Sequence, residues 1–336
     1  MVESNCKKMK AIGGYFELAD YEEGGVFPHQ DGILLNTGRN ALEYILRSIG
    51  EVKLIYLPYY TCEVVLEPIN KLHIPYTYYH INQQFEIIDD IQPKEGEYII
   101  ANNYFGIKDA YIQQLVERYG DRLIVDCAQA FFAQPLPGIK AFYSARKYVG
   151  VADGGVAYLG DLPGDKLEIN ETERTDEHDS HLLKRKQFGA EAGFADYQAN
   201  EKKLDNQPIR LMSDTTKQIL RHINYDNVIA CRRENFQYLH EALSAKNQLQ
   251  MPAFETFACP MVYPFMMGTR SLRKELIESK VFVAKYWPNV EQRNGFEIER
   301  DMADKVFPIP CDQRYGIIDM QTIVDIINNL SNGKRI

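Results

Sequence analysis

Polar residues follow two apolar runs in the middle of this 336-residue chain. Asp126 lies near the end of the run that begins at Leu123, whereas Ser144 and Lys147 follow the run 139–143. A lysine amine can bond to an aldehyde, a carboxylate can keep a pyridine nitrogen protonated, and a hydroxyl can bind a phosphate oxygen. Pyridoxal phosphate needs these groups, so the sequence predicts a site for this cofactor at Lys147, Asp126 and Ser144.

Each of these residues also has a purely structural interpretation. Asp126 could cap a helix that begins near Ala128, and Lys147 taken alone could be a solvated surface lysine. The short spacing between Ser144 and Lys147 favours a shared pocket instead. The pair Gly154-Gly155 would then allow a tight backbone turn beside the cofactor.

A second candidate anion site precedes the first expected helix, at Gly38, Arg39 and Asn40. Free backbone N–H groups and the helix dipole make a helix start suitable for a phosphate. An ordinary glycine-containing cap is the alternative. Downstream, Tyr60 could stack on a pyridine ring, although core packing of this tyrosine is the simpler interpretation.

Short apolar runs alternate with helix-like segments from Leu34 to about Leu159. This alternation is typical of an α/β fold with a mostly parallel sheet flanked by helices. The expected strands, rich in Ile, Val, Tyr or Phe, are 53–57, 74–81, 97–102, 122–127, 140–144 and 155–159, and the expected helices are 40–49, 62–71 and 109–119.

We expect two domains. Residues 30–245 would form the large domain, with a charged and exposed excursion at 161–206 and one long helix or two joined helices at 213–243. Residues 246–336 would form a smaller α+β domain, joined by the segment 1–29. In that domain, Arg314 could bind a substrate carboxylate or phosphate, or could form a structural salt bridge.

Composition excludes several classes of protein. The net charge of −9 argues against a nucleic-acid binder, and no apolar run approaches the ~20 residues of a membrane-spanning helix. The six cysteines are widely spaced and no signal peptide is visible, so a soluble, cytoplasmic protein is expected. His178 and His181 have the spacing of two metal ligands on a helix, but no third ligand is near them in sequence, and we expect no metal site.

An ordered set of motifs resembles the fold-type I pyridoxal phosphate enzymes, and within them the DegT/DnrJ/EryC1/StrS sugar aminotransferases. The resemblance implies that Lys147 bonds covalently to the cofactor and later moves protons, that Asp126 pairs with the pyridine nitrogen, and that Gln129 lies near the ring. It also implies that Ser144 and the segment 38–40 bind the phosphate. The motifs that carry it are Thr37-Gly38-Arg39-Asn40-Ala41-Leu42, Leu57-Pro58-Tyr59-Tyr60-Thr61-Cys62, Tyr104-Phe105-Gly106, Asp126-Cys127-Ala128-Gln129-Ala130, Ser144-Ala145-Arg146-Lys147 and Asp153-Gly154-Gly155, with later matches around Arg210 and Pro310.

Family members move an amino group from glutamate or glutamine to a keto sugar carried on a nucleotide, and are usually homodimers. The resemblance therefore implies a transaminase, in a pathway to an amino sugar for a surface polysaccharide or natural product. The chain departs from the family pattern at Arg39, Cys62 and Pro208. Two alternatives stay open: another reaction with the same cofactor, such as sugar dehydration or amino-acid transformation, and a binding protein that has lost catalysis.

Overall fold

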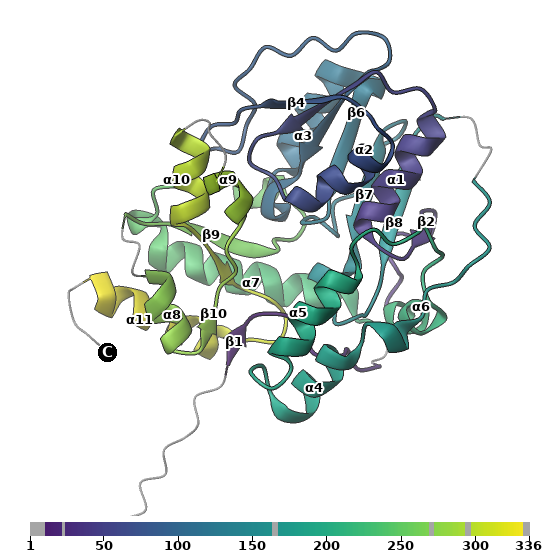
Figure 1. Ribbon diagram of the computed structural model, residues 1–336. Helices are drawn as coiled ribbons and strands as arrows, with labels where there is room; N and C mark the ends of the chain where they lie inside the picture. Colours follow the sequence, from purple (N-terminus) through teal and green to yellow (C-terminus); the bar gives the residue numbers. More distant parts are fainter. Residues whose placement is uncertain (1–10, 22–23, 163–166, 269–271, 293–296, 332–336) are drawn as a thin grey trace, which may run out of the picture.

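A seven-stranded sheet forms the centre of the computed structural model, which describes residues 11–21, 24–162, 167–268, 272–292 and 297–331 (Figure 1). Along the sheet the strands lie in the order β2 (Ile33–Leu35), β8 (Gly155–Leu159), β7 (Lys140–Ser144), β6 (Leu123–Cys127), β5 (Glu97–Asn102), β3 (Leu54–Pro58) and β4 (Tyr76–Tyr79). The strands from β7 to β4 are all parallel, whereas β8 runs antiparallel to its neighbours β7 and β2. This arrangement confirms the expected α/β fold with a mostly parallel sheet.

Alternating side chains of the strands point to opposite faces of the sheet, and each face has its own core. In β6, Leu123 and Val125 belong to one apolar cluster and Ile124 to the other. Helices α1 (Gly38–Ile49) and α2 (Leu66–Lys71) cover the face of Ile124, and α3 (Asp109–Tyr119) covers the opposite face. Burial on both faces explains why these strands are continuous apolar runs in the sequence.

The charged segment 161–206 is largely exposed, as expected, but it also contributes buried polar residues. It forms two helices, α4 (Ser180–Phe188) and α5 (Phe194–Lys203), that pack against each other. His181, Arg185 and Asn200 are buried there, because their polar groups find partners within the segment or in the N-terminal segment. These three residues are exceptions to the expected exposure of the segment.

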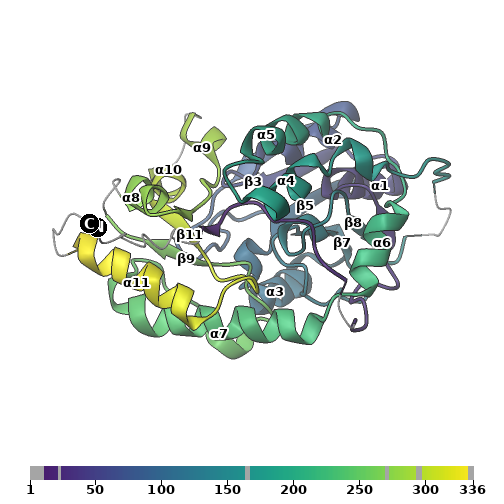
Figure 2. The ribbon, with the colours of Figure 1, turned by 90° about the horizontal axis from the view of Figure 1, so that it is seen from below.

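The expected helical stretch after Ser213 is two joined helices, α6 (Asp214–Arg221) and α7 (Tyr225–Leu243). Helix α7 lies beside the C-terminal helix α11 (Ile317–Ser331), as Figure 2 shows from below. The other elements after α7 are α8 (Leu272–Glu278), α9 (Pro288–Gln292), α10 (Glu297–Lys305), the antiparallel pair β9 (Val262–Met266) and β11 (Val306–Pro310), and β10 (Val281–Phe282). Strand β10 pairs with β1 (Ile12–Gly13), which ties the N-terminal segment to this part of the chain.

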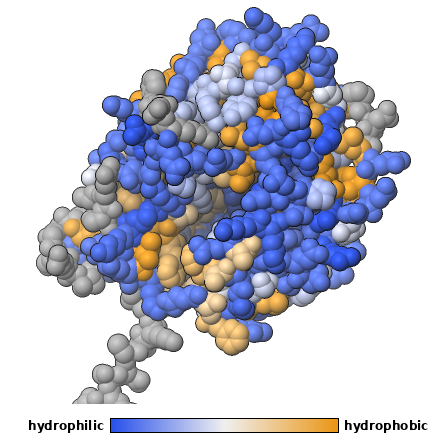
Figure 3. Space-filling model, in the orientation of Figure 1, coloured by the Kyte–Doolittle hydropathy of each residue, from blue (hydrophilic) through white to orange (hydrophobic). Residues whose placement is uncertain are grey.

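The face of the molecule seen in Figure 3 is mainly hydrophilic, with smaller hydrophobic areas between the polar side chains. Within the described residues, no helix combines the length and apolar character needed to cross a membrane.

His29 is a buried histidine that should make folding sensitive to acid. Its Nε2 lies 2.6 Å from the carbonyl oxygen of Phe131 and therefore donates, whereas Nδ1 accepts from the hydroxyl of Tyr158 at 3.2 Å. Burial lowers the pKa of His29 to about 4, against the opposing effect of the bond to Phe131. The unfolded chain binds this proton near pH 6.5, so the free energy of unfolding falls as the pH decreases from about 6.5 towards about 4.

Urea unfolding of His29→Gln and of the unchanged protein at pH 7 and pH 5 tests this effect. Between these pH values the unchanged protein should lose about 1 to 2 kcal/mol more than the variant, because glutamine does not titrate. His222→Gln, at an exposed position, serves as the control and should follow the unchanged protein. Equal pH dependence in the unchanged protein and in His29→Gln would contradict the assignment.

Candidate active site

The carboxyl ends of the parallel strands meet at one edge of the sheet, where open α/β sheets bind ligands. Asp126 is the fourth residue of β6, in register with Asn102 of β5 and Phe142 of β7. Ser144 ends β7, and Lys147 follows in the short 3-10 turn Ala145–Lys147. The sheet therefore brings the predicted aspartate, serine and lysine to the same edge.

Asp126 is a buried carboxylate close to Lys147. Its Oδ1 accepts a hydrogen bond from the N–H of Ala128 at 2.8 Å, the bond expected of a capping aspartate. Burial raises the pKa of Asp126 above its ordinary value, and the positive charge of Lys147 opposes this shift. No salt bridge of Asp126 is found among the described residues. A cationic group placed beside this carboxylate would therefore favour its ionised form.

Lys147 and Ser144 line a cavity of about 670 Å³. Other walls come from the N-terminal segment, the α4–α5 segment and the part of the chain after α7, including Tyr15, Tyr197 and Tyr286. The ring of Tyr15 stacks on that of Tyr197 at 4.9 Å between centroids, so two of these walls are in contact. The volume is in the range of small-molecule sites in proteins.

Gln129 has a buried donor without an acceptor. Its Oε1 accepts from the backbone N–H of Phe105 at 3.0 Å, which fixes the orientation of the amide. Its Nε2 is buried and has no hydrogen-bond partner in the described part of the chain. A buried, unsatisfied amide donor is costly, and a ligand acceptor would remove this cost.

The start of α1 lies against Ser144. The side chain of Thr37 caps this helix by accepting from the N–H of Asn40 at 3.1 Å. The first backbone bond of the helix runs from the N–H of Ala41 to the carbonyl of Thr37. The N–H groups of Gly38 and Arg39 therefore precede the intrahelical ladder. A Cβ added to Gly38 would lie 3.6 Å from Cβ of Ser144, so the helix start and the serine are neighbours.

Gly155 permits this arrangement. A Cβ at this position would lie 2.2 Å from the carbonyl oxygen of Thr37, a contact that a real side chain cannot make. The glycine thus allows the cap of α1 to approach β8 closely, which is a different use from a turn beside the cofactor. Asp153 accepts from the backbone N–H of Ser213 at 2.7 Å and from its hydroxyl at 2.7 Å, and so holds the start of α6.

The side chains of Arg39 and Asn40 do not match their expected phosphate role. The guanidinium of Arg39 contacts Glu67 at 2.8 Å and Asp205 at 2.9 Å. The amide of Asn40 accepts from the hydroxyl of Thr37 at 2.6 Å and donates to the carbonyl of Gln207 at 2.9 Å. Both side chains therefore bind other groups of the protein. An anion at this helix start could bind only to the backbone N–H groups.

Tyr60 does not line the cavity, and neither do Asp126 and Gln129. It is fully buried, its ring packs edge-on against Trp287 at 4.7 Å, and its hydroxyl donates to the carbonyl of Tyr286 at 3.3 Å. Its position matches the core-packing interpretation. The aromatic wall of the cavity comes instead from residues distant in sequence.

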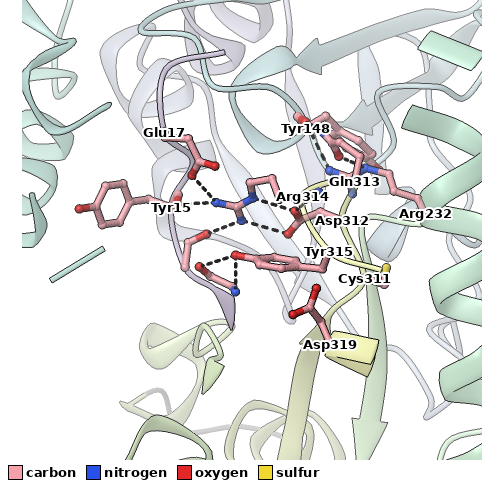
Figure 4. A network of polar contacts seen from close by, with 12 residues as sticks. Tyr15, Glu17, Tyr148, Arg232, Cys311, Asp312, Gln313, Arg314, Tyr315 and Asp319 are labelled. Atoms are coloured by element: carbon pink, nitrogen blue, oxygen red, sulfur yellow. Dashed lines mark hydrogen bonds and ion pairs between the residues drawn. The ribbon is translucent and has the colours of Figure 1, made fainter. Parts of the chain in front are cut away.

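Arg314 is a structural residue (Figure 4). Its Nε donates to Oδ1 of Asp312 at 2.7 Å, and its Nη1 contacts Glu17 at 3.1 Å. The same nitrogen donates to the carbonyl of Tyr15, and Nη2 donates to Asp312 and to the carbonyl of Gly14. The guanidinium thus ties the N-terminal segment to the loop before α11, and of its two predicted roles the structural salt bridge is the one observed.

The two histidines of the charged segment have separate partners. His178 Nε2 lies 3.2 Å from Oε1 of Glu173, and His181 Nδ1 lies 3.0 Å from Nδ2 of Asn200. Ligand atoms of Glu173, Glu177 and His178 lie within 4.8 Å of one another. Asn36 already donates to Glu173 at 3.0 Å, and we propose no metal there.

Sequence reasoning missed several residues of the cavity wall. Arg146 directly precedes Lys147, and Glu201 on α5 contacts it at 2.7 Å. His181 also lines the cavity, and burial together with the charge of Arg146 lowers its pKa to about 4. Arg146 belongs to a quoted motif and His181 to a histidine pair, but neither pattern indicates a shared cavity, because these residues and Glu201 converge only through the packing of α4 and α5.

Comparison of the sequence with family models and with curated proteins finds no match. Comparison of the structure finds several similar proteins of known structure. AtS13 from Actinomadura melliaura has a TM-score of 0.65 and 17% identity, over 95% of this chain and 99% of that chain. DesV from S. venezuelae has a TM-score of 0.63 and 15% identity, over 91% of this chain and 85% of that chain.

A DegT DnrJ EryC1 StrS aminotransferase from Brucella abortus has a TM-score of 0.61 and 15% identity, over 89% of this chain and 85% of that chain. The sugar aminotransferase CalS13 from Micromonospora echinospora has a TM-score of 0.59 and 17% identity, over 89% of this chain and 87% of that chain. The chain shares the fold of these proteins. The suspected resemblance is confirmed at the level of the fold. At these identities a shared fold does not by itself establish a shared activity.

Proposed function

We propose that this protein is a pyridoxal phosphate-dependent aminotransferase that moves an amino group from glutamate or a similar donor to a nucleotide-linked keto sugar. The observation that carries the proposal is a buried carboxylate, Asp126, close to Lys147 at the carboxyl edge of the sheet. The fold shared with solved structures described as sugar aminotransferases supports the substrate class.

The residues at this edge fit the cofactor in their donor and acceptor chemistry. Asp126 is buried without a salt bridge among the described residues, so a protonated pyridine nitrogen would supply its missing counter-charge. The unpartnered Nε2 of Gln129 would donate to an oxygen of the ring. The N–H groups of Gly38 and Arg39, with the adjacent hydroxyl of Ser144, would bind the phosphate.

When bound, pyridoxal phosphate supplies an electron sink for the electrons left on a carbon that loses a proton. Asp126 would sustain that sink by staying ionised beside the ring nitrogen. Lys147 would hold the cofactor through Nζ and, once released, would take a proton at Nζ and return it, as general base and then general acid. The walls of the cavity around Lys147 would limit the access of water.

The proposed phosphate contact of Ser144 gives a direct test of cofactor binding. Ser144→Ala should raise the dissociation constant of pyridoxal phosphate roughly 10-fold, because one hydrogen bond to a charged group is lost. Fluorescence titration of the cofactor-free protein measures this constant. Ser48→Ala, which removes a hydroxyl bonded to the carbonyl of Tyr44 within α1, is the control. Equal affinities of Ser144→Ala and the unchanged protein would remove Ser144 from the phosphate site.

Addition of glutamate to the cofactor-loaded protein tests the proposed reaction. The visible absorption of the bound cofactor should change, 2-oxoglutarate should form, and a nucleotide-linked keto sugar should then restore the first spectrum. A panel of keto sugars and amino donors identifies the substrates. No spectral change with any amino donor would contradict the transaminase proposal.

The quaternary structure is part of the same proposal. We expect a homodimer, and analytical ultracentrifugation of the cofactor-loaded protein measures its mass directly. A monomer with full activity would contradict this part.

A further inference from the structure

Arg146 is a cation beside Lys147 whose donors are only partly satisfied. Both side chains line the cavity. Nη2 of Arg146 lies 2.7 Å from Oε1 of Glu201. Its Nε is buried and has no hydrogen-bond partner within the described ranges of the chain. The guanidinium therefore keeps capacity for a further acceptor.

The other arginines of the cavity wall, Arg185 and Arg232, donate hydrogen bonds to side chains and backbone carbonyls of the protein. Arg232 donates to the side chain of Gln313 at 2.8 Å and to the carbonyl of Met261 at 3.0 Å. Arg185 donates through Nε to Glu17 at 2.8 Å and through Nη2 to the carbonyl of Gly13 at 2.9 Å, although its Nη1 has no partner among the described residues. These contacts fix both guanidinium groups in place.

Glu201 is an exchangeable counter-ion for Arg146. It belongs to α5, and 37% of its side chain is exposed, so it can turn towards water. Burial alone would raise the pKa of Glu201, but the guanidinium of Arg146 outweighs this effect and the pKa is lowered. The glutamate is therefore ionised at neutral pH and offers Arg146 the same group that a carboxylate ligand would offer.

We propose that Arg146 binds the carboxylate of the amino donor, which takes the place of Glu201. This inference rests on the proposed aminotransferase function. The α-carboxylate of an amino acid is attached to the same carbon as the amine that must react beside Lys147, so a cation next to this lysine suits it. The diphosphate of a nucleotide sugar is separated from the reacting carbon by atoms of the sugar ring, and suits a more distant cation.

Competition explains why an acid occupies this position. Without a donor, Glu201 neutralises Arg146 and limits the cost of a buried, unpaired guanidinium. When a donor binds, one carboxylate replaces another at the same nitrogen atoms, so the charge beside Lys147 changes little. Removal of Glu201 should therefore strengthen donor binding, whereas removal of Arg146 should weaken it.

Glutarate is a suitable probe, because it carries the carboxylates of glutamate without the amine. Its dissociation constant from the cofactor-loaded protein, measured by calorimetry, should rise roughly 10- to 100-fold in Arg146→Met, since a charged hydrogen-bonded pair is lost. In Glu201→Gln the dissociation constant should fall roughly threefold, because the competing ion pair is partly exposed and such pairs contribute little free energy. The KM for glutamate should change in the same directions.

Asp196→Asn is the matched control. Asp196 also lies on α5 and pairs with Lys184 of α4 at 2.5 Å, but neither residue lines the cavity. Glutarate should bind this variant as it binds the unchanged protein. If the affinity for glutarate rose by a similar factor in Asp196→Asn and in Glu201→Gln, loosening of α5 and not competition at Arg146 would be the cause. That result would overturn the proposal.

Two further results would overturn it. The first is unchanged glutarate binding in Arg146→Met. The second is a rise in the KM for a nucleotide amino sugar in the reverse reaction of Arg146→Met that is larger than the rise in the dissociation constant of glutarate, because this would assign Arg146 to the diphosphate. Failure of the unchanged protein to transfer any amino group would count against the proposed function instead, and the glutarate measurements would still decide the role of Arg146.

Discussion

Lys147→Ala should abolish amino transfer and leave the fold intact. The substitution removes the amine that would hold the cofactor and carry the proton, and general acid–base catalysis alone contributes up to roughly 10⁴-fold in rate. Lys147 is partly exposed in the cavity wall, and we find no salt bridge to it among the described residues, so its loss should cost little stability. Transaminase assays and thermal unfolding measure the two effects.

Lys274→Ala is the control for this variant, because Lys274 lies on α8 with 79% of its side chain exposed. It should keep full activity. If Lys147→Ala retained activity within a few fold of the unchanged protein, the role assigned to Lys147 in cofactor attachment and proton transfer would be wrong.

Asp126→Ala should weaken cofactor binding and slow the reaction together. Removing one partner from a buried ion pair costs about 3–5 kcal/mol, which corresponds to roughly 10²–10⁴ in affinity or rate. Asp126→Asn should have nearly the same effect, because asparagine can keep the hydrogen bond from Ala128 but not the charge. Cofactor titration and steady-state kinetics measure both variants.

The cofactor-free protein gives an independent check on Asp126. Burial raises the pKa of this carboxyl in the folded state, so above its unfolded pKa the ionised group costs stability. Asp126→Asn should therefore unfold at a higher urea concentration than the unchanged protein at pH 7 without cofactor, although it binds the cofactor less tightly. Unchanged rates and unchanged cofactor affinity in both variants would mean that the ring nitrogen has another partner.

The sheet could be predicted closely from the sequence. The expected bounds of α3, β5, β7 and β8 agree with the observed ones, and β6 differs by one residue. These strands are buried on both faces or packed against a helix, so their apolar runs end where the strands end. Parallel pairing then brings Asp126, Ser144 and Lys147 to one edge, although their chemical roles remain predictions.

The remaining walls of the cavity could not be predicted in this way. Strands β1 and β10 have two residues each and pair across the length of the chain, so neither produces a periodic pattern. Helix α5 carries mostly polar residues, yet Glu201 reaches the cavity because Arg146 attracts it there. Tyr60 lies in the core because Tyr286 and Trp287 dock on it from far along the sequence.

Borohydride reduction of the protein loaded with pyridoxal phosphate, followed by peptide mapping, tests the central claim most directly. Reduction would fix any bond between a lysine and the cofactor aldehyde. The account predicts a single pyridoxyl label on the peptide that contains Lys147, and no label in Lys147→Ala. A protein that takes up no cofactor, or a label on another lysine with Lys147 unmodified, would contradict it.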